Sequence, residues 1–140
     1  FNFTTGQHDV AKVTKSAYDA CNGGSAVLTL TSGPATITLN ETGKQYYICS
    51  FGTHCSAGQK LAINVKRASS STPSPVPTPA PEATSPSPSS RSAPTPAPGP
   101  SSGGPVTYTV GETAGWIVPG NASFYRAWAS AKHFKVGDVL

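Results

Sequence analysis

The chain lacks the residue patterns of the common classes of enzyme. Its 140 residues contain no carboxylate pair in a catalytic context, no Ser-His-Asp pattern and no glycine-rich phosphate loop. No apolar run reaches the roughly 18 residues that a membrane-spanning helix needs, and no signal peptide opens the chain. The sequence therefore predicts neither an enzyme nor a membrane-spanning protein.

Charged residues are also sparse, at 11% of the chain, with a formal net charge of +4. Lys12 and Lys15 alternate with apolar residues, as side chains on the solvent face of a strand do. We see no cluster of basic and aromatic residues, so we expect no nucleic-acid partner. A solvated surface that aids solubility is the favoured interpretation, and a weak attraction for acidic polysaccharide is the alternative.

Only three cysteines are present, so a single disulfide leaves one thiol over. The sequence alone allows any of three pairings, and a tight Cys49–Cys55 bridge is the simplest of them. A zinc site built from His8, Cys49, His54 and Cys55 is another interpretation, although the C-x2-C pairs usual in such sites are absent. A leftover cysteine in a secreted chain needs a role, and a metal-bound thiolate supplies one.

The most informative stretch is a strand followed by a short loop, residues 46–59. Period-two alternation places Tyr47 and Cys49 on one face of the strand and Tyr46 and Ile48 on the other. The strand breaks at residues 51–52, and a histidine and a glutamine follow on the loop.

A thiolate at a strand end, with an imidazole and a third donor on the adjoining loop, is typical of one half of a type 1 copper site. Such a site takes two histidines and one cysteine in a near-trigonal plane, with a long, weak axial ligand. Cys49, His54 and Gln59 supply this half, and His8 is the candidate second histidine.

Several stretches resemble the phytocyanins, the plant blue copper proteins of the cupredoxin fold: GQHDV at 6–10, QYYICSFGTHC at 45–55 and AGQKLAINV at 57–65. Residues 106–140 resemble the amino-terminal third of that family, through GETAGWIVPGNASFYRAWASAKHFKVGDVL. The resemblance implies an all-β, cupredoxin-like Greek-key β-sandwich with one or two short helices. A glutamine at the axial position is the choice of the stellacyanin and umecyanin branch.

Carried over residue by residue, the resemblance implies one copper ion held by His8, Cys49 and His54, with Gln59 as the axial ligand. It also implies a structural disulfide between Cys21 and Cys55. We expect Asp9 to face solvent, although it could orient a ligand. His133 has no partner motif, and we expect no metal role for it.

The order of the segments differs from that of the family, in which the equivalent of 106–140 precedes the equivalent of 1–67. We therefore predict one folded domain in circularly permuted order, made of 1–67 and 106–140. Twelve of the fourteen prolines lie in the linker 68–105, so we expect polyproline II structure and disorder there. Compared with the family, one residue is missing between Leu140 and Phe1.

Local patterns predict the individual elements. A helical turn over 16–20 would be capped by Ser16, and a helix over 123–133 would bury Phe124, Ala127, Trp128 and Ala131. The runs 25–31 and 35–39 are predicted to pair as a hairpin. The predicted strands are 9–15, 25–31, 35–39, 45–50, 60–66 and 106–110.

Type 1 copper carries one electron, so the resemblance implies a secreted, monomeric one-electron carrier at the plant cell wall or the outer face of the plasma membrane. The redox partner is unknown, with a small-molecule reductant or a cell-wall component as candidates. The family's precursors commonly carry a leader and a lipid-anchor signal, and we expect both to have been removed or omitted here. The alternative function is an arabinogalactan-type structural or adhesion glycoprotein of the cell wall, in which copper is incidental.

Three sequons, at Asn2, Asn40 and Asn121, predict N-glycosylation and passage through the secretory route. A disulfide would agree with that route, since disulfides persist in oxidising compartments.

Overall fold

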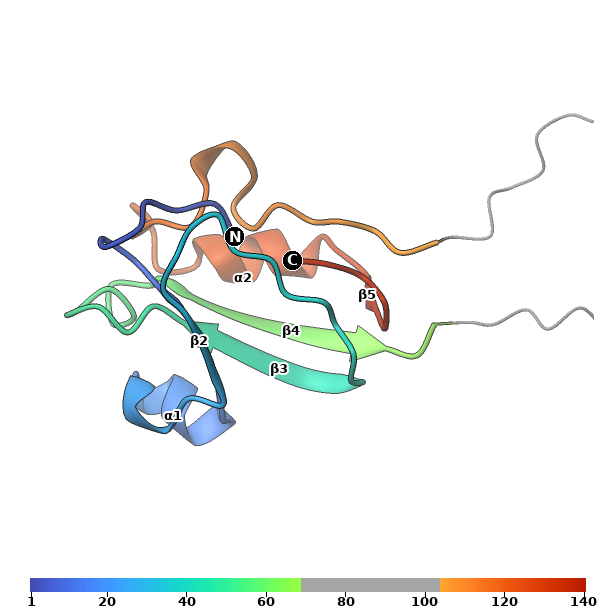
Figure 1. The fold of residues 1–140 in the computed structure, drawn as a ribbon, viewed down its shortest axis with the longest axis horizontal. Helices are drawn as coiled ribbons and strands as arrows, with labels where there is room; N and C mark the ends of the chain where they lie inside the picture. Colours follow the sequence, from blue (N-terminus) through green and yellow to red (C-terminus); the bar gives the residue numbers. More distant parts are fainter. Residues whose placement is uncertain (69–103) are drawn as a thin grey trace, which may run out of the picture. The chain divides into compact units, whose positions relative to one another are not determined.

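A computed structural model describes residues 1–68 and 104–140 (Figure 1). These two ranges form one compact unit. The expectation of an extended, disordered linker falls almost entirely on 69–103, which lie outside the described residues. No helix of the described ranges is long and apolar enough to cross a bilayer.

The unit is built on one five-stranded sheet with the order β2-β1-β3-β4-β5. Adjacent strands are antiparallel, except that β4 and β5 are parallel. The pairing of β4 with β5 joins the two described ranges. The strands are β1 (Val10–Val13), β2 (Leu28–Leu30), β3 (Gly43–Ile48), β4 (Lys60–Lys66) and β5 (Phe134–Lys135).

Alternation along β3 and β4 separates two apolar clusters, one on each face of the sheet. Tyr47, Cys49 and Leu61 enter the main core, whereas Ile48 and Tyr46 face a smaller cluster on the other side. The main core lies between the sheet and a layer of extended segments, as Figure 1 shows above β3 and β4. The prediction of an all-β, two-layered fold is therefore confirmed.

The second layer is held by backbone hydrogen bonds among residues 1–3, 35–39, 106–108 and 137–140. Ile37 exchanges two bonds of 2.9 Å with Leu140, and Ala35 exchanges two of 2.9 Å with Phe1. Such pairs recur at every second residue of an antiparallel ladder. Phe1 therefore lies two residue positions beyond Leu140 along the segment that pairs with residues 35–39. The permuted order itself stays a prediction.

The predicted hairpin of 25–31 with 35–39 is wrong. β2 pairs with β1, and residues 35–39 cross to the other layer, where they pair with Phe1 and Leu140. Alternating apolar residues identify a strand but not its partner, which depends on residues far away in the chain. The predicted strand 106–110 forms only an isolated bridge between Thr107 and Val139.

Two short α-helices accompany the sheet, α1 (Lys15–Ala20) and α2 (Phe124–Ser130), with 3-10 turns at Gly23–Ser25 and Glu112–Ala114. The predicted cap Ser16 is wrong. The strand ends at Val13, so the helix starts earlier, and Thr14 Oγ1 accepts the Ala17 N–H instead.

The predicted buried face of α2 is right for Trp128 and for Phe124, which packs against the core, but wrong for Ala127 and Ala131, which are exposed. The helix turns Tyr125 inward instead. Tyr125 is buried because its hydroxyl finds partners: it lies 2.7 Å from the Ile117 carbonyl oxygen and accepts the Ile117 N–H at 2.9 Å. A buried tyrosine needs such bonds. The hydroxyl also lies 3.1 Å from the Gly115 carbonyl oxygen, so its contacts reach the backbone on both sides of Trp116.

We expect Tyr125→Phe to lower the free energy of unfolding by about 1–2 kcal/mol, since the Ile117 amide loses its partner. Burial raises the pKa of Tyr125 to about 12. Because this folded-state value exceeds the ordinary one, the stabilisation is complete below about pH 10 and is lost as the pH rises through 12. Urea titrations between pH 10 and 12 should show that the free energy of unfolding falls less with pH in the variant than in the wild type. An equal fall in both proteins would contradict the role given to the Tyr125 hydroxyl.

Candidate metal centre

Three donor side chains meet at one end of the sheet. His8 precedes β1, Cys49 follows β3, and His54 lies on the loop after it. Cys49 Sγ lies 3.5 Å from His54 Nδ1 and 4.0 Å from His8 Nδ1. All the ligating atoms lie within 4.8 Å of one another. The cysteine is fully buried, and both imidazoles are partly exposed.

Gln59 is the fourth predicted residue, and it is also buried at the site, with 0% exposure. Its Nε2 donates to the Trp116 carbonyl oxygen at 3.0 Å. Since a carbonyl can only accept, the amide nitrogen must face Trp116, and Oε1 faces the donor cluster, 3.1 Å from His8 Nδ1. The structure thus brings together all four residues singled out as ligands.

The pairing of β1 with β3 explains why His8 and Cys49 meet although 41 residues separate them. In this antiparallel register Ala11 stands opposite Ile48. Continued beyond the strand ends, the same register places Asp9 opposite Ser50, with His8 and Cys49 as diagonal neighbours.

Asp9 corrects the sequence prediction, which had it facing solvent. It is only 3% exposed, and its carboxylate accepts hydrogen bonds from the Ser50 amide, at 2.6 Å, and from the Ser50 hydroxyl. Because Asp9 follows His8 and Ser50 follows Cys49, these bonds tie the two ligand-bearing segments together. No local signal could have revealed this, since the partner lies on a distant strand.

Trp116 is a second positioning residue that the sequence did not assign to the site. Its indole Nε1 donates to the Asp9 carbonyl oxygen at 2.8 Å, while its own carbonyl oxygen holds Gln59. Trp116 belongs to the 104–140 range, so that range completes the surroundings of ligands that all lie in residues 1–68.

The loop that carries His54 closes on itself and on β3. Gln59 N–H donates to the His54 carbonyl oxygen at 2.9 Å, and Cys49 N–H donates to the Gln59 carbonyl oxygen at 3.0 Å. Gly58 has a φ of +105°, and a Cβ there would lie 2.6 Å from Ala122 Cα. This position therefore requires glycine.

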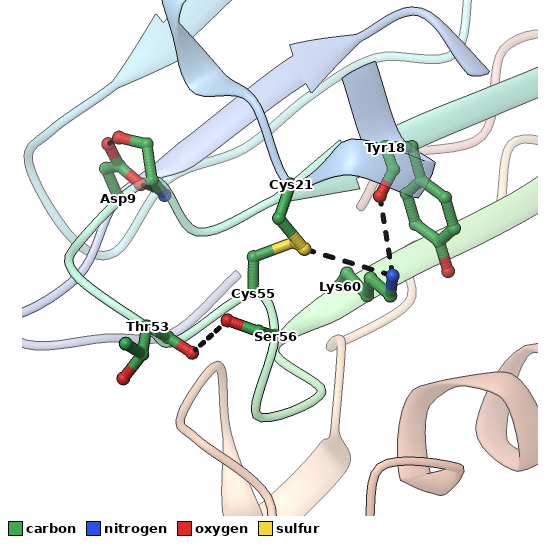
Figure 2. The surroundings of a disulfide bond; sticks show 8 residues. Asp9, Tyr18, Cys21, Thr53, Cys55, Ser56 and Lys60 are labelled. Atoms are coloured by element: carbon green, nitrogen blue, oxygen red, sulfur yellow. Dashed lines mark hydrogen bonds between the residues drawn. A yellow bond between two sulfur atoms is a disulfide. The ribbon is translucent and has the colours of Figure 1, made fainter. Parts of the chain in front are cut away.

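A disulfide joins Cys21, at the end of α1, to Cys55, directly after His54, which is the pairing that the resemblance implied (Figure 2). Lys60 Nζ lies beside it, within 3.4 Å of the Tyr18 carbonyl oxygen. The bridge anchors the ligand loop to α1. It also removes two open alternatives, the Cys49–Cys55 bridge and the zinc site that needed a free Cys55.

The donor set fits the copper ion that the resemblance implies. Bonds of roughly 2.0–2.3 Å to one sulfur and two nitrogens in a trigonal plane place the donors about 3.5–4 Å apart, as the thiol and imidazoles stand here. Burial raises the pKa of the Cys49 thiol, so the thiol is neutral until a cation draws off its proton. Gln59 Oε1 adds a weak fourth donor.

The remaining candidate residues lie elsewhere. His133 is exposed and only its carbonyl oxygen is bonded, to Tyr108; within the described ranges the one cluster of potential ligands is His8, Cys49 and His54. The sequon residues Asn2, Asn40 and Asn121 are all exposed. Their glycosylation stays a prediction.

Comparison with known proteins agrees with this geometry. The plastocyanin-like domain family matches residues 1–59. A blue copper protein of Arabidopsis thaliana is 44% identical over 71 residues, which cover 51% of this chain and 36% of that protein. Stellacyanin of Toxicodendron vernicifluum is 38% identical over 65 residues, 46% of this chain and 61% of its own length.

Among solved structures, spinach plantacyanin is 42% identical, with 47% of this chain and 71% of that chain covered and a TM-score of 0.42. The chain spans about a third of the length of the first curated relatives that it matches.

We expect Asp9→Ala to cost about 1–3 kcal/mol of stability in the metal-free protein, because the Ser50 amide and hydroxyl lose their buried acceptor. Asp9→Asn keeps one acceptor oxygen and serves as the matched control, with a smaller loss. Chemical denaturation measures both. Equal stability of the alanine variant and the wild type would contradict the role of Asp9 as the link between the two segments.

Proposed function

This chain belongs to the plastocyanin-like domain family, and from that premise we propose that it is a one-electron carrier with a type 1 copper site. The observation that carries the proposal is the convergence of one buried thiol and two imidazoles within 4.8 Å. One cysteine and two histidines are the equatorial donor set of electron-transfer copper sites. Similarity to proteins named blue copper protein supports it.

Copper supplies one-electron chemistry between Cu(II) and Cu(I) when it is bound. His8, Cys49 and His54 would hold it, with the Gln59 amide oxygen as the axial donor. The task of the chain is to keep the donors in nearly the same place in both oxidation states. The Asp9–Ser50 bonds, the Cys21–Cys55 bridge and the Trp116 contacts do this by fixing the segments that carry the ligands.

The four donors differ in their exposure to solvent, and we assign the exposed ones to electron transfer and the buried ones to shielding of the metal. Cys49 and Gln59 are fully buried, which excludes water from the thiolate. His8 and His54 are partly exposed, and Phe51 stacks on His54 at 6.4 Å between ring centroids. The imidazole edges are the shortest route from the site to a partner. Four protein donors leave no position open for a substrate, which favours electron transfer over catalysis.

We place this activity outside the plant cell, at the cell wall or the outer face of the plasma membrane. The disulfide and the three exposed sequons support an oxidising, secretory route. The partner is a small-molecule reductant or a cell-wall component, and the carrier acts as a monomer. The structural-glycoprotein alternative rests on the proline content of 68–105, and it requires no redox-active copper.

Addition of Cu(II) to the purified chain should produce an intense visible band that ascorbate bleaches, because thiolate-to-copper charge transfer causes it. Cys49→Ser should abolish the band, whereas Ser56→Ala, an exposed change on the same loop, should retain it. Optical titration with circular dichroism as a check on folding measures this. A band that survives Cys49→Ser would contradict the site, and a folded wild type with no band would favour the structural alternative.

Gln59→Met should raise the reduction potential, because the amide oxygen is a harder donor than a thioether and favours Cu(II). Spectroelectrochemical titration of both proteins gives the two potentials. An unchanged or lower potential in the methionine variant would show that Gln59 is not the axial ligand.

A further inference from the structure

The outer face of the sheet, on the side of β3 and β4 that α1 covers, bears a groove that the metal centre does not use. It is a hollow of about 360 Å³ that runs from α1 across both strands to α2. The polar and aromatic side chains along it are Lys15, Tyr18, Asp19, Lys44, Tyr46, Asn64 and Arg126.

Strand register explains how the groove forms. Lys44 stands opposite Asn64, and Tyr46 stands opposite Ala62. The period of two sends all four side chains to the outer face, because their neighbours Gln45, Tyr47, Ile63 and Val65 are buried. Ala62 has only a methyl group, which leaves room beside the ring of Tyr46.

The groove is positively charged. Lys15 is paired with Asp19 at 2.5 Å, whereas Lys44 and Arg126 are exposed and form no ion pair within the described ranges. A second hollow, of about 340 Å³, shares Asn64 and Arg126 with the first and adds Lys66 and Lys132. Lys132 is paired with Glu112 at 2.7 Å. The two adjoining hollows, together called the groove below, therefore offer three cations without an ion pair in the described ranges: Lys44 on β3, Lys66 on β4 and Arg126 on α2.

Two tyrosines lie among these charges. The rings of Tyr18 and Tyr46 are 5.2 Å apart between centroids and tilted by 50°. Tyr18 and Arg126 line the same hollow. Burial raises the pKa of Tyr18, and the positive charge of Arg126 opposes that rise. The sequence shows no such cluster, because the residues come from α1, β3 and α2 and meet only in the fold. The expectation of no nucleic-acid partner stays a prediction.

We propose that this groove binds an acidic polysaccharide, a chain of sugar rings that carry carboxylates. The spaced cations Lys44, Lys66 and Arg126 match carboxylates repeated along such a chain, and arginine binds them with two parallel hydrogen bonds. The tyrosine hydroxyls and the Asn64 amide can both donate to and accept from the hydroxyls of the sugar rings. No groove residue is a ligand of the metal centre, so binding is independent of copper.

The aromatic geometry favours a saccharide over single-stranded nucleic acid. Bases bind by stacking on separate, open aromatic faces. Here Tyr18 and Tyr46 pack against each other, and Lys60 Nζ lies over the Tyr18 ring at 4.7 Å from its centroid. Ring edges and hydroxyls remain, and these suit sugar rings better than bases.

The test is calorimetric titration of the full chain, without metal, using polygalacturonate as the probe. We expect binding that weakens as salt is raised, and no binding of neutral dextran. Lys44→Gln with Arg126→Gln should weaken it at least tenfold. The matched control, Lys12→Gln with Arg67→Gln, removes the same charge away from the groove and should change affinity less than twofold. Lys44, Arg67 and Arg126 are exposed, whereas Lys12 is half-buried and paired with Glu41 at 3.2 Å. Thermal melting therefore checks that both variants fold.

Asn64→Glu is a second, independent test of the binding site, because it adds a carboxylate at the centre of the groove without removing a cation. We expect it to abolish binding. The proposal is overturned if the wild type fails to bind, if the control pair loses as much affinity as the groove pair, or if Asn64→Glu has no effect. Equal or tighter binding of dextran sulfate or single-stranded DNA would overturn it too, by showing attraction to any polyanion.

Discussion

The alignment of β1 with β3 is the constraint on which the metal centre depends. A one-residue slip in this register would turn Asp9 away from Ser50 and separate His8 from Cys49. The buried carboxylate of Asp9 locks the register at the end where the strands part. A charged group is costly to bury without partners. The two bonds of Asp9 with Ser50 therefore make the observed register strongly preferred over registers shifted by one residue.

The second constraint joins the two described ranges. All the candidate ligands lie in residues 1–68, but Trp116 holds both the Asp9 backbone and the Gln59 amide. Its own amide donates to the Asn2 carbonyl oxygen at 2.7 Å. β5 adds to β4, and residues 137–140 add to 35–39, so neither range has a complete core without the other. The site is therefore a property of the assembled unit and not of the ligand motif alone.

The sequence predicted what local patterns carry. The alternation in 60–66 predicts β4 and its buried face. The strand and loop of 46–59 predict three of the donors, Cys49, His54 and Gln59. His8 was the candidate second histidine from the sequence, and the resemblance supplied the disulfide pairing. Asp9, the partner of β2 and the basic groove were beyond reach, because each depends on a pairing between distant segments. Lys44 and Arg126 illustrate this: nothing near either residue in the chain indicates the other, and only the packing of α2 beside β4 unites them.

The most direct measurement of the central claim is X-ray absorption at the copper edge, on the full chain loaded with one equivalent of Cu(II) and again after reduction. Because the frame around Cys49, His8 and His54 is fixed in advance, we expect one short sulfur scatterer and two imidazole nitrogens in both states, with little change in their distances. A first shell of nitrogen and oxygen alone, or a large change of distance on reduction, would contradict it.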